Sequence, residues 1–268
     1  MGVAANSQVN YLLHLADNAL ILGQRDAEWC GHGPVLEEDI AMANISLDLI
    51  GQARLLYQHV ADLQADGATE DSLAYFRDPD EFRNYTLLEL PHFPSATGPL
   101  AGTASAERDY ATAIVRNFLY SALMQLLWPA LEQSTDAQLA AIAARAAKEV
   151  RYHLRHSRDW LVRMGDGTDE SHQRVQSALN HLMPYTQEFW TPSEAELEAL
   201  RLGVGPDVAS LRPQWDDLVN EALTEATLKR PSDIGYITQG KNRQHSEHLG
   251  YVLGDMQVLA RQHPGAQW

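Results

Sequence analysis

The amino-acid sequence predicts an all-α protein, and three observations support that prediction. Apolar residues recur at intervals of three and four over most of the chain, no segment shows sustained apolar–polar alternation, and runs of β-branched residues are absent. Long helices joined by short loops are typical of an antiparallel bundle. We therefore expect a single domain over residues 1–268, built as an antiparallel four-helix bundle with additional C-terminal helices.

The first two bundle helices are expected at about residues 9–25 and 36–65. Leu12, Leu15 and Ala16 begin the apolar stripe of the first helix. The segment "EWCGHGP" then separates the two helices with two glycines and a proline. The second helix is apolar on nearly every side over residues 39–57, which predicts burial all round.

The other two bundle helices are expected at roughly residues 106–133 and 136–164. A short helical stretch and a loop rich in Pro and Gly, residues 90–105, precede them. The tripeptide "STD" between the two helices offers N-cap residues for the second of them. The sequence thus provides four long helices for the bundle.

A fifth helix is expected after the bundle, and two or three further helices are expected in roughly the last 75 residues. The segment "GDGTDES" ends the fourth helix and caps a fifth, which Pro184 ends or kinks. The segments "GVGP" and "KRPSDIG" separate the helices that follow, and Ser246 is expected to cap the last one. These are the additional C-terminal helices.

The composition excludes several classes of protein. A formal net charge of −16 argues against nucleic acid and anionic membrane surfaces as partners, because both require clustered Lys and Arg. No apolar run reaches the 18 residues of a membrane span, and the N-terminal "MGVAANSQVN" lacks the features of a secretory signal. With Cys30 as the single cysteine, we expect a reducing compartment, and hence a soluble cytoplasmic protein.

Polar residues interrupt the second helix at regular intervals. Asn44, Asp48 and Gln52 follow each other at spacings of four, and we expect them to stack along one face. An ionised Asp in an apolar helix is costly unless it is paired or hydrogen-bonded. This polar line either faces a water-filled seam or a partner chain, or belongs to a site between helices that holds or once held a metal.

The segment "KEVRYHLRHSRDWL" (148–161) places Glu149 one helical turn before His153. At 100° per residue, His153 falls on the inward arc and Glu149 at its edge. The pair could share a buried hydrogen bond or supply two metal ligands. Lys148, Arg151, Arg155 and Arg158 lie on the opposite side, where the three arginines form either a solvated face or a docking surface.

The ligand pattern of a di-iron bundle is incomplete. Such a site takes a Glu from each of two helices and Glu-x-x-His from each of the other two. Only Glu89 and His92 have that spacing, and Pro91 and Pro94 prevent a regular helix there. The residue three after Glu149 is Tyr152. The residues therefore assign no metal site and no catalytic residue to this chain.

Three stretches resemble the C-subunit family of bacterial ring-1,2-phenylacetyl-CoA epoxidases. They are "EWCGHGPVLEEDIAMANISLDLIGQAR" (28–54), "AKEVRYHLRHSRDWLVRMGDGTDES" (147–171) and "HSEHLGYVLGDMQVL" (245–259), and the terminal "PGAQW" (264–268) fits as well. The resemblance implies a ferritin-like fold and a place in the multicomponent monooxygenase of phenylacetate degradation, which oxidises an aromatic ring.

The same resemblance implies partners and cofactors. A catalytic A subunit would carry the di-iron centre and the phenylacetyl-CoA site, a small B subunit is also required, and a reductase subunit with flavin and iron–sulfur groups would take electrons from NADPH. This chain would pair with the A subunit in a stable hetero-oligomer, as a structural subunit with no cofactor and no catalytic residue of its own. Five residues would then be vestiges of a lost site: Asn44, Asp48, Gln52, Glu149 and His153.

Two other interpretations remain open at this point. The chain could itself bind two irons and activate oxygen, in which case Asp48, Glu149 and His153 would have to be ligands. It could also be a ferritin-like binding or storage protein outside this pathway.

Overall fold

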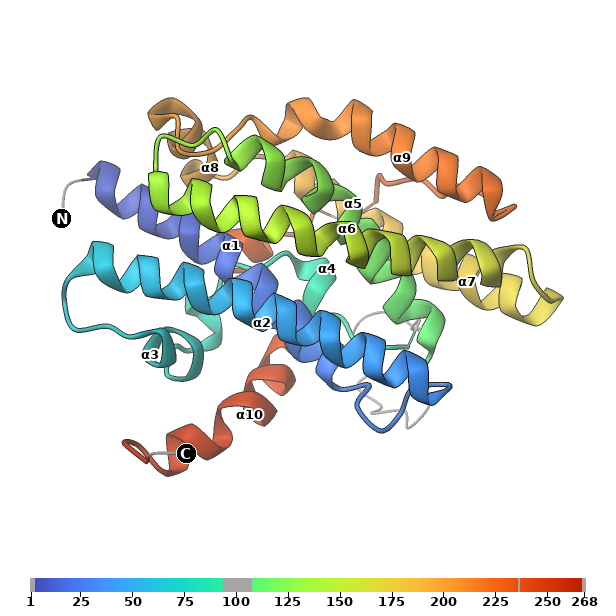
Figure 1. Cartoon of the computed structure of the whole chain (residues 1–268), viewed down its shortest axis with the longest axis horizontal. Coiled ribbons are helices and arrows are strands. Elements are labelled where there is room, and N and C mark those ends of the chain that lie inside the picture. Colours follow the sequence, from blue (N-terminus) through green and yellow to red (C-terminus); the bar gives the residue numbers. More distant parts are fainter. Residues whose placement is uncertain (1–2, 94–107, 236, 267–268) are drawn as a thin grey trace. The chain divides into compact units, whose positions relative to one another are not determined.

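The computed structural model describes residues 3–93, 108–235 and 237–266 (Figure 1). These residues form ten α-helices and four short 3-10 helices. Within the same ranges the only β-structure is an isolated bridge between Gln239 and Gln244. The prediction of an all-α protein is confirmed.

Contacts along the chain group it into two compact units. The first unit comprises Met1–Leu90, Ser193–Val204 and Gln239–Trp268. The second unit comprises Pro91–Pro192 and Gly205–Thr238. The expectation of one domain over residues 1–268 stays a prediction.

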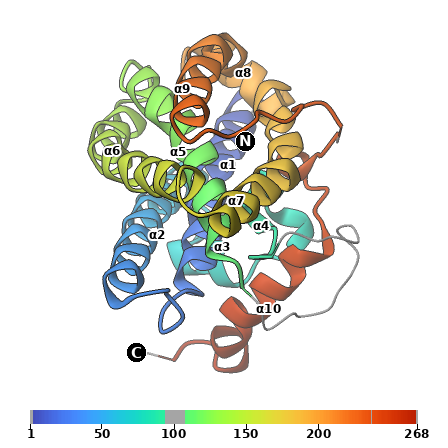
Figure 2. The ribbon, with the colours of Figure 1, turned by 90° about the vertical axis from the view of Figure 1, so that its right-hand side faces the viewer.

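In the first unit, the long antiparallel helices α1 (Val3–Ala27) and α2 (Leu36–Gln64) lie side by side (Figures 1 and 2). Ser46 of α2 donates a 2.6 Å hydrogen bond to the carbonyl of Gly23 in α1, and a Cβ on Gly23 would lie 3.2 Å from Leu49. Glycine at position 23 therefore permits the close approach of the two helices. The helices of this unit are α1 (Val3–Ala27), α2 (Leu36–Gln64), α3 (Glu70–Tyr75), α4 (Thr86–Glu89), α8 (Glu194–Leu202) and α10 (Glu247–Gln262), with 3-10 turns at Pro79–Glu81 and Gly240–Asn242.

In the second unit, the most enclosed helix is α5 (Tyr110–Leu131). It packs against α6 (Ala137–Gly165), α7 (Asp169–Leu182) and α9 (Arg212–Glu225) (Figure 2). Every side chain from Tyr110 to Met124 is buried. The indole of Trp215 in α9 donates a 3.1 Å hydrogen bond to the carbonyl of Leu119. The helices of this unit are α5 (Tyr110–Leu131), α6 (Ala137–Gly165), α7 (Asp169–Leu182) and α9 (Arg212–Glu225), with 3-10 helices at Met183–Trp190 and Val208–Leu211.

Most of the predicted helix boundaries are confirmed. Asp136 caps α6 by accepting from the amides of Gln138 and Leu139, as its place in "STD" predicts. Thr168 caps α7, which ends at Leu182, and a 3-10 helix that contains Pro184 continues the chain from Met183. Ser246 caps α10. The predicted fifth helix is α7, and the further C-terminal helices are α8, α9 and α10.

Two helix starts differ from the prediction. The first helix begins at Val3 rather than near residue 9, and the third begins at Tyr110 rather than near residue 106. Asp109 is the N-cap of the third helix, because its side chain accepts a 2.9 Å hydrogen bond from the amide of Ala111. Residues 94–107, which hold most of the loop predicted at 90–105, lie outside the described residues.

The predicted burial of α2 on every side is wrong. Ile40 is 53% exposed and Leu47 is 66% exposed, while the opposite side of the helix packs against α1. The helix that is buried all round is α5. Both helices are apolar around most of their circumference, and only tertiary packing decides which of them is enclosed.

Candidate functional site

The three predicted polar residues of α2 do not share one environment. Asn44 is exposed, Asp48 is half-buried and Gln52 is buried. Four residues turn a helix by 400°, so each member of the line is displaced by about 40° from the one before. The line therefore stays on one side of the helix but runs obliquely from solvent into the core.

The predicted geometry of α6 is confirmed. His153 is buried together with Ile142 and Ala146, while Glu149 lies at the edge with 18% of its side chain exposed. Glu149 accepts a 3.1 Å hydrogen bond from Nε of Arg145, one turn earlier on the same helix. Glu149 thus has an exposed cation of its own helix as one of its partners.

The basic face of α6 divides into two parts. Arg151 and Arg155 are exposed, as a solvated face requires. Arg158 is half-buried and forms ion pairs with Glu221 at 3.2 Å and Glu225 at 2.6 Å, both on α9. Arg158 thus joins two helices of the second unit.

The five candidate residues lie in two different units. Asn44, Asp48 and Gln52 belong to the first unit, and Glu149 and His153 belong to the second. Across residues 3–93, 108–235 and 237–266, no three His, Cys, Asp or Glu side chains are grouped in a way that could hold a metal ion.

A different set of polar residues, which the sequence reasoning missed, is buried in the first unit. The helix α1 carries His14, Asp17 and Asn18 on its inner side, and each is at most 3% exposed. Their spacings of three and four match the helical period. The signal in the sequence is a group of polar residues within one turn of an otherwise apolar helix, and the apolar stripe alone does not reveal it.

Asp17 is the acceptor at the centre of the first buried cluster. Its carboxylate accepts from the hydroxyl of Tyr57 at 2.5 Å and from the backbone amide of Arg83 at 2.8 Å, and it pairs with the guanidinium of Arg77. Burial and the negative charge of Asp17 raise the pKa of Tyr57 well above its usual value. Both oxygens of the Asp17 carboxylate therefore accept hydrogen bonds, which link α1 to α2 and to the segment after α3.

Glu196 of α8 is the acid of the second buried cluster. Its carboxylate lies 2.8 Å from Nζ of Lys241 and 4.0 Å from Nε2 of His14, and all three side chains are at most 4% exposed. Burial opposes ionisation of Glu196, but the charges of Lys241 and His14 outweigh it and lower its pKa. Burial lowers the pKa of His14, whose Nδ1 donates to the carbonyl of Arg83 at 2.7 Å.

Glu89 anchors the third buried cluster, and it is the Glu of the single Glu-x-x-His sequence. Its carboxylate accepts from Nδ2 of Asn84 at 2.8 Å, from Nδ1 of His245 at 2.8 Å and from the amide of Ser246 at 2.6 Å. These contacts join α4 to the start of α10. Glu89 therefore holds the fold of the first unit together and has a full set of protein partners.

These clusters do not fit a di-iron site. An iron ligand must present a free lone pair toward the metal, whereas Asp17, Glu89 and Glu196 each face a cationic group or an imidazole of the protein. Each acid is compensated in the way that buried charges require. The three clusters link separate segments of the first unit through buried ion pairs and hydrogen bonds.

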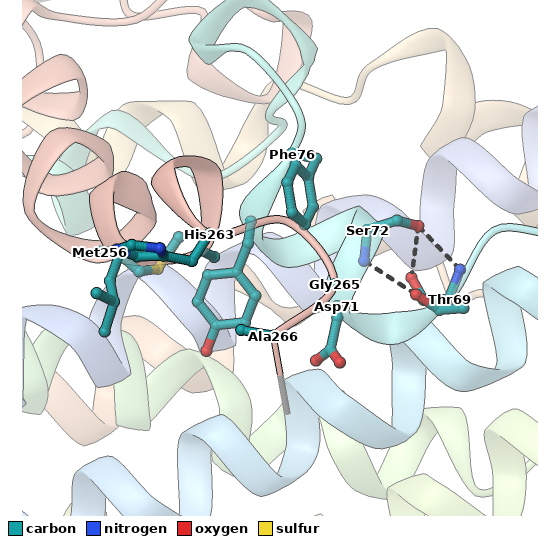
Figure 3. Close-up of a pocket in the computed structure, with 11 residues that line it drawn as sticks. Thr69, Asp71, Ser72, Phe76, Met256, His263, Gly265 and Ala266 are labelled. Carbon is teal, nitrogen blue, oxygen red and sulfur yellow. Dashed lines mark hydrogen bonds between the residues drawn. The ribbon is translucent and has the colours of Figure 1, made fainter. Parts of the chain in front are cut away.

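A cavity of about 570 Å³ lies between α3 and the end of α10 (Figure 3). Its apolar lining includes Phe76 and Met256, and Asp71 and His263 contribute the polar groups. Thr69 and Ser72 at its edge form the capping box of α3. Among the described residues that line this cavity, Asp71 and His263 are not hydrogen-bonded to each other, so they do not form an acid–base pair.

None of the helices in the described ranges is both long enough and apolar enough to cross a membrane.

Comparison with known proteins gives the family. The family model described as phenylacetic acid catabolic protein matches residues 2–268. A curated relative, the C subunit of the 1,2-phenylacetyl-CoA epoxidase of Escherichia coli (strain K12), is 43% identical over 263 residues, which cover 98% of this chain and 100% of the relative. The resemblance found in the sequence is confirmed, and the ferritin-like helical fold of the family agrees with the observed helices. The chain belongs to the phenylacetic acid catabolic protein family.

Proposed function

We propose that this chain is the C subunit of a bacterial phenylacetyl-CoA epoxidase and serves as a structural subunit without an active site of its own. The observation that carries the proposal is the 43% identity to the C subunit of such an epoxidase over 98% of the chain. Similarity over the full length of both proteins favours the same place in the same assembly.

The chemistry of the buried acids supports the non-catalytic part of the proposal. Asp17, Glu89 and Glu196 are compensated by Arg77, His245 and Lys241. Oxygen activation in this fold needs carboxylates and imidazoles aimed at a common metal position. The acids of the first unit face protein groups instead, which favours a structural role for this chain over a catalytic one.

The proposal includes partners of the chain. A catalytic A subunit would hold the di-iron centre and bind phenylacetyl-CoA, a small B subunit would complete the oxygenase, and a reductase with flavin and iron–sulfur groups would pass electrons from NADPH. The assembly would work in the cytoplasm. A bundle packed beside the catalytic subunit restricts the movement of the helices that carry its ligands, as a supporting shell does for any preorganised site.

The first test is the iron content of the purified chain. The chain is incubated anaerobically with ferrous iron, excess metal is removed, and bound iron is counted, with the A subunit treated in parallel as the positive control. We expect no bound iron on this chain and about two irons on the A subunit. Close to two irons on this chain would overturn the structural role, and Asp48, Glu149 and His153 would then be mutated in turn.

The second test is reconstitution of phenylacetyl-CoA epoxidation from the purified subunits. With the A subunit, the B subunit and the reductase present, we expect omission of this chain to abolish turnover or to leave the A subunit insoluble. An A subunit that is fully active without this chain would contradict the proposal. That outcome would favour a ferritin-like binding protein outside the pathway.

A further inference from the structure

The exposed side of α2 carries a continuous apolar strip. We call it the α2 ridge, and define it by residues that follow each other at spacings of four, three, four and three: Leu36, Ile40, Ala43, Leu47 and Ile50. Leu36 is 70% exposed, Ile40 53% and Leu47 66%. Ala43 and Ile50 at the margin of the strip are half-buried. Three large apolar side chains exposed over about three turns of one helix are unusual on a monomer and mark an interaction surface.

The spacing of the α2 ridge is that of a helix–helix seam. Alternation of three and four keeps apolar residues on one side of a helix, where they interdigitate with those of a second helix. Gly51 lies beside Leu47 on the same side, and a Cβ built there meets no atom within 4 Å. A second helix can therefore approach the backbone of α2 closely at this point.

Charge decides which kind of helix fits the α2 ridge. Glu37, Asp48 and Asp62 project on one flank of the ridge, and Arg54, the only Lys or Arg of α2, is paired with Glu70 at 2.9 Å. A second copy of this chain, with its net charge of −16, would bring the same acidic flank to the contact. A helix with Lys or Arg along that flank would be attracted to it.

We propose that the α2 ridge is the docking surface for an α-helix of another subunit, one that presents an apolar seam flanked by basic side chains. The inference rests on the proposed function, because a permanent structural subunit requires a partner. Leu36, Ile40 and Leu47 supply the apolar centre of the contact, and Glu37 and Asp62 orient the incoming helix through its basic flank.

The first experiment measures binding of the full chain to the purified di-iron A subunit by surface plasmon resonance. Leu47→Glu places a charge at the centre of the α2 ridge, and we expect it to weaken binding ~30-fold or more, as at the centre of other interfaces. Leu197→Glu is the matched control, because Leu197 on α8 is also an exposed helical leucine, 54% exposed. Its binding should stay within about threefold of the unaltered chain.

A second pair of variants guards against a folding defect. Gly51→Tyr adds bulk beside the α2 ridge, and Gly254→Tyr adds the same bulk on α10, where the space around the Cβ is equally open. Replacing a helical glycine in open space does not destabilise a helix, so both proteins should keep their circular dichroism and thermal midpoint. We expect Gly51→Tyr alone to lower the affinity, by ~10-fold or more.

The outcomes separate the two proposals. An unaltered chain that binds no A subunit, together with full epoxidation in its absence, would overturn the proposed function. An unaltered chain and a Leu47→Glu chain that bind the A subunit equally well would leave the function standing and overturn the docking surface. Sedimentation of the chain alone as a dimer that Leu47→Glu splits would show that a second copy, rather than another subunit, occupies the α2 ridge.

Discussion

His245 shows how single residues set the stability of the first unit. Its Nδ1 lies 2.8 Å from the Glu89 carboxylate and its Nε2 lies 2.9 Å from the carbonyl of Phe82. Both neighbours are acceptors, so both ring nitrogens must carry a proton to satisfy them. Burial by itself lowers the pKa of His245, but the hydrogen bond and charge of Glu89, with the Phe82 carbonyl, outweigh burial and raise it.

This arrangement predicts a pH-dependent stability. Because the folded pKa of His245 is raised, its stabilising contribution is complete below the unfolded pKa of about 6.5 and is lost as the pH rises through the folded pKa. His245→Gln should therefore lower the free energy of unfolding more at about pH 6 than at about pH 9, as measured by urea unfolding. His263→Gln, at the exposed end of α10, is the control, and equal losses for His245→Gln at both pH values would contradict the prediction.

The pair of Lys241 and Glu196 gives a second prediction at the residue scale. Lys241→Met would leave the Glu196 carboxylate buried without its cation, and the free energy of unfolding should fall by ~3–5 kcal/mol. The double variant Lys241→Met/Glu196→Gln should recover at least half of that loss, because a glutamine at position 196 can still complete the capping box of Ser193. Urea unfolding near neutral pH measures both.

A surface lysine serves as the control for that pair. Lys229 is exposed in the segment after α9, and Lys229→Met should change the free energy of unfolding by less than ~0.5 kcal/mol. If Lys241→Met behaves like Lys229→Met, the buried ion pair contributes nothing and the prediction fails.

The packing of whole elements depends on small residues at helix ends. Gly165 ends α6 where Ala226 follows α9, and a Cβ on Gly165 would lie 2.5 Å from the carbonyl oxygen of Ala226 and 2.8 Å from its Cβ. Neither the carbonyl oxygen nor the Cβ of Ala226 can move aside by a side-chain rotation, so a Cβ at position 165 would force the backbone to shift. The two helix ends can meet in the second unit only if position 165 has no side chain.

The corresponding prediction is that Gly165→Ala destabilises the protein by ~1–3 kcal/mol, since overpacking forces the backbone to shift. Gly254→Ala is the matched control on α10, where the space is open, and it should be neutral or stabilising by up to ~1 kcal/mol. Thermal unfolding of both variants measures the difference. A Gly165→Ala protein as stable as the Gly254→Ala protein would show that α6 and α9 tolerate a wider separation.

The same scale explains why one helix was predicted well and another was not. On α6, polar and apolar residues alternate with a clear helical period, so the inward position of His153 and the edge position of Glu149 followed from the sequence. On α2, apolar residues occur all round, and no period indicates which side is covered. The exposure of Ile40 and Leu47 could be learned only from the packed structure.

At the scale of the whole molecule, the net charge of −16 and the α2 ridge both favour association with a different protein. A strongly acidic chain repels its own copies and attracts a partner of opposite charge. An apolar strip beside acidic residues gives such a partner both a contact and an orientation. Membership of a family that includes a subunit of a multicomponent epoxidase is consistent with a chain built for hetero-association.

The sequence by itself determined the all-α class, most helix boundaries and the family, because helical period, capping residues and long shared motifs are local properties of the chain. Tertiary structure alone decided which polar residues are buried together. His14, Asp17 and Asn18 find partners between 60 and 69 positions away, in the segment around Arg77 and Tyr85, and Glu196 meets Lys241 from a different part of the chain. Such pairs leave no local pattern, since the fold rather than the spacing brings them into contact.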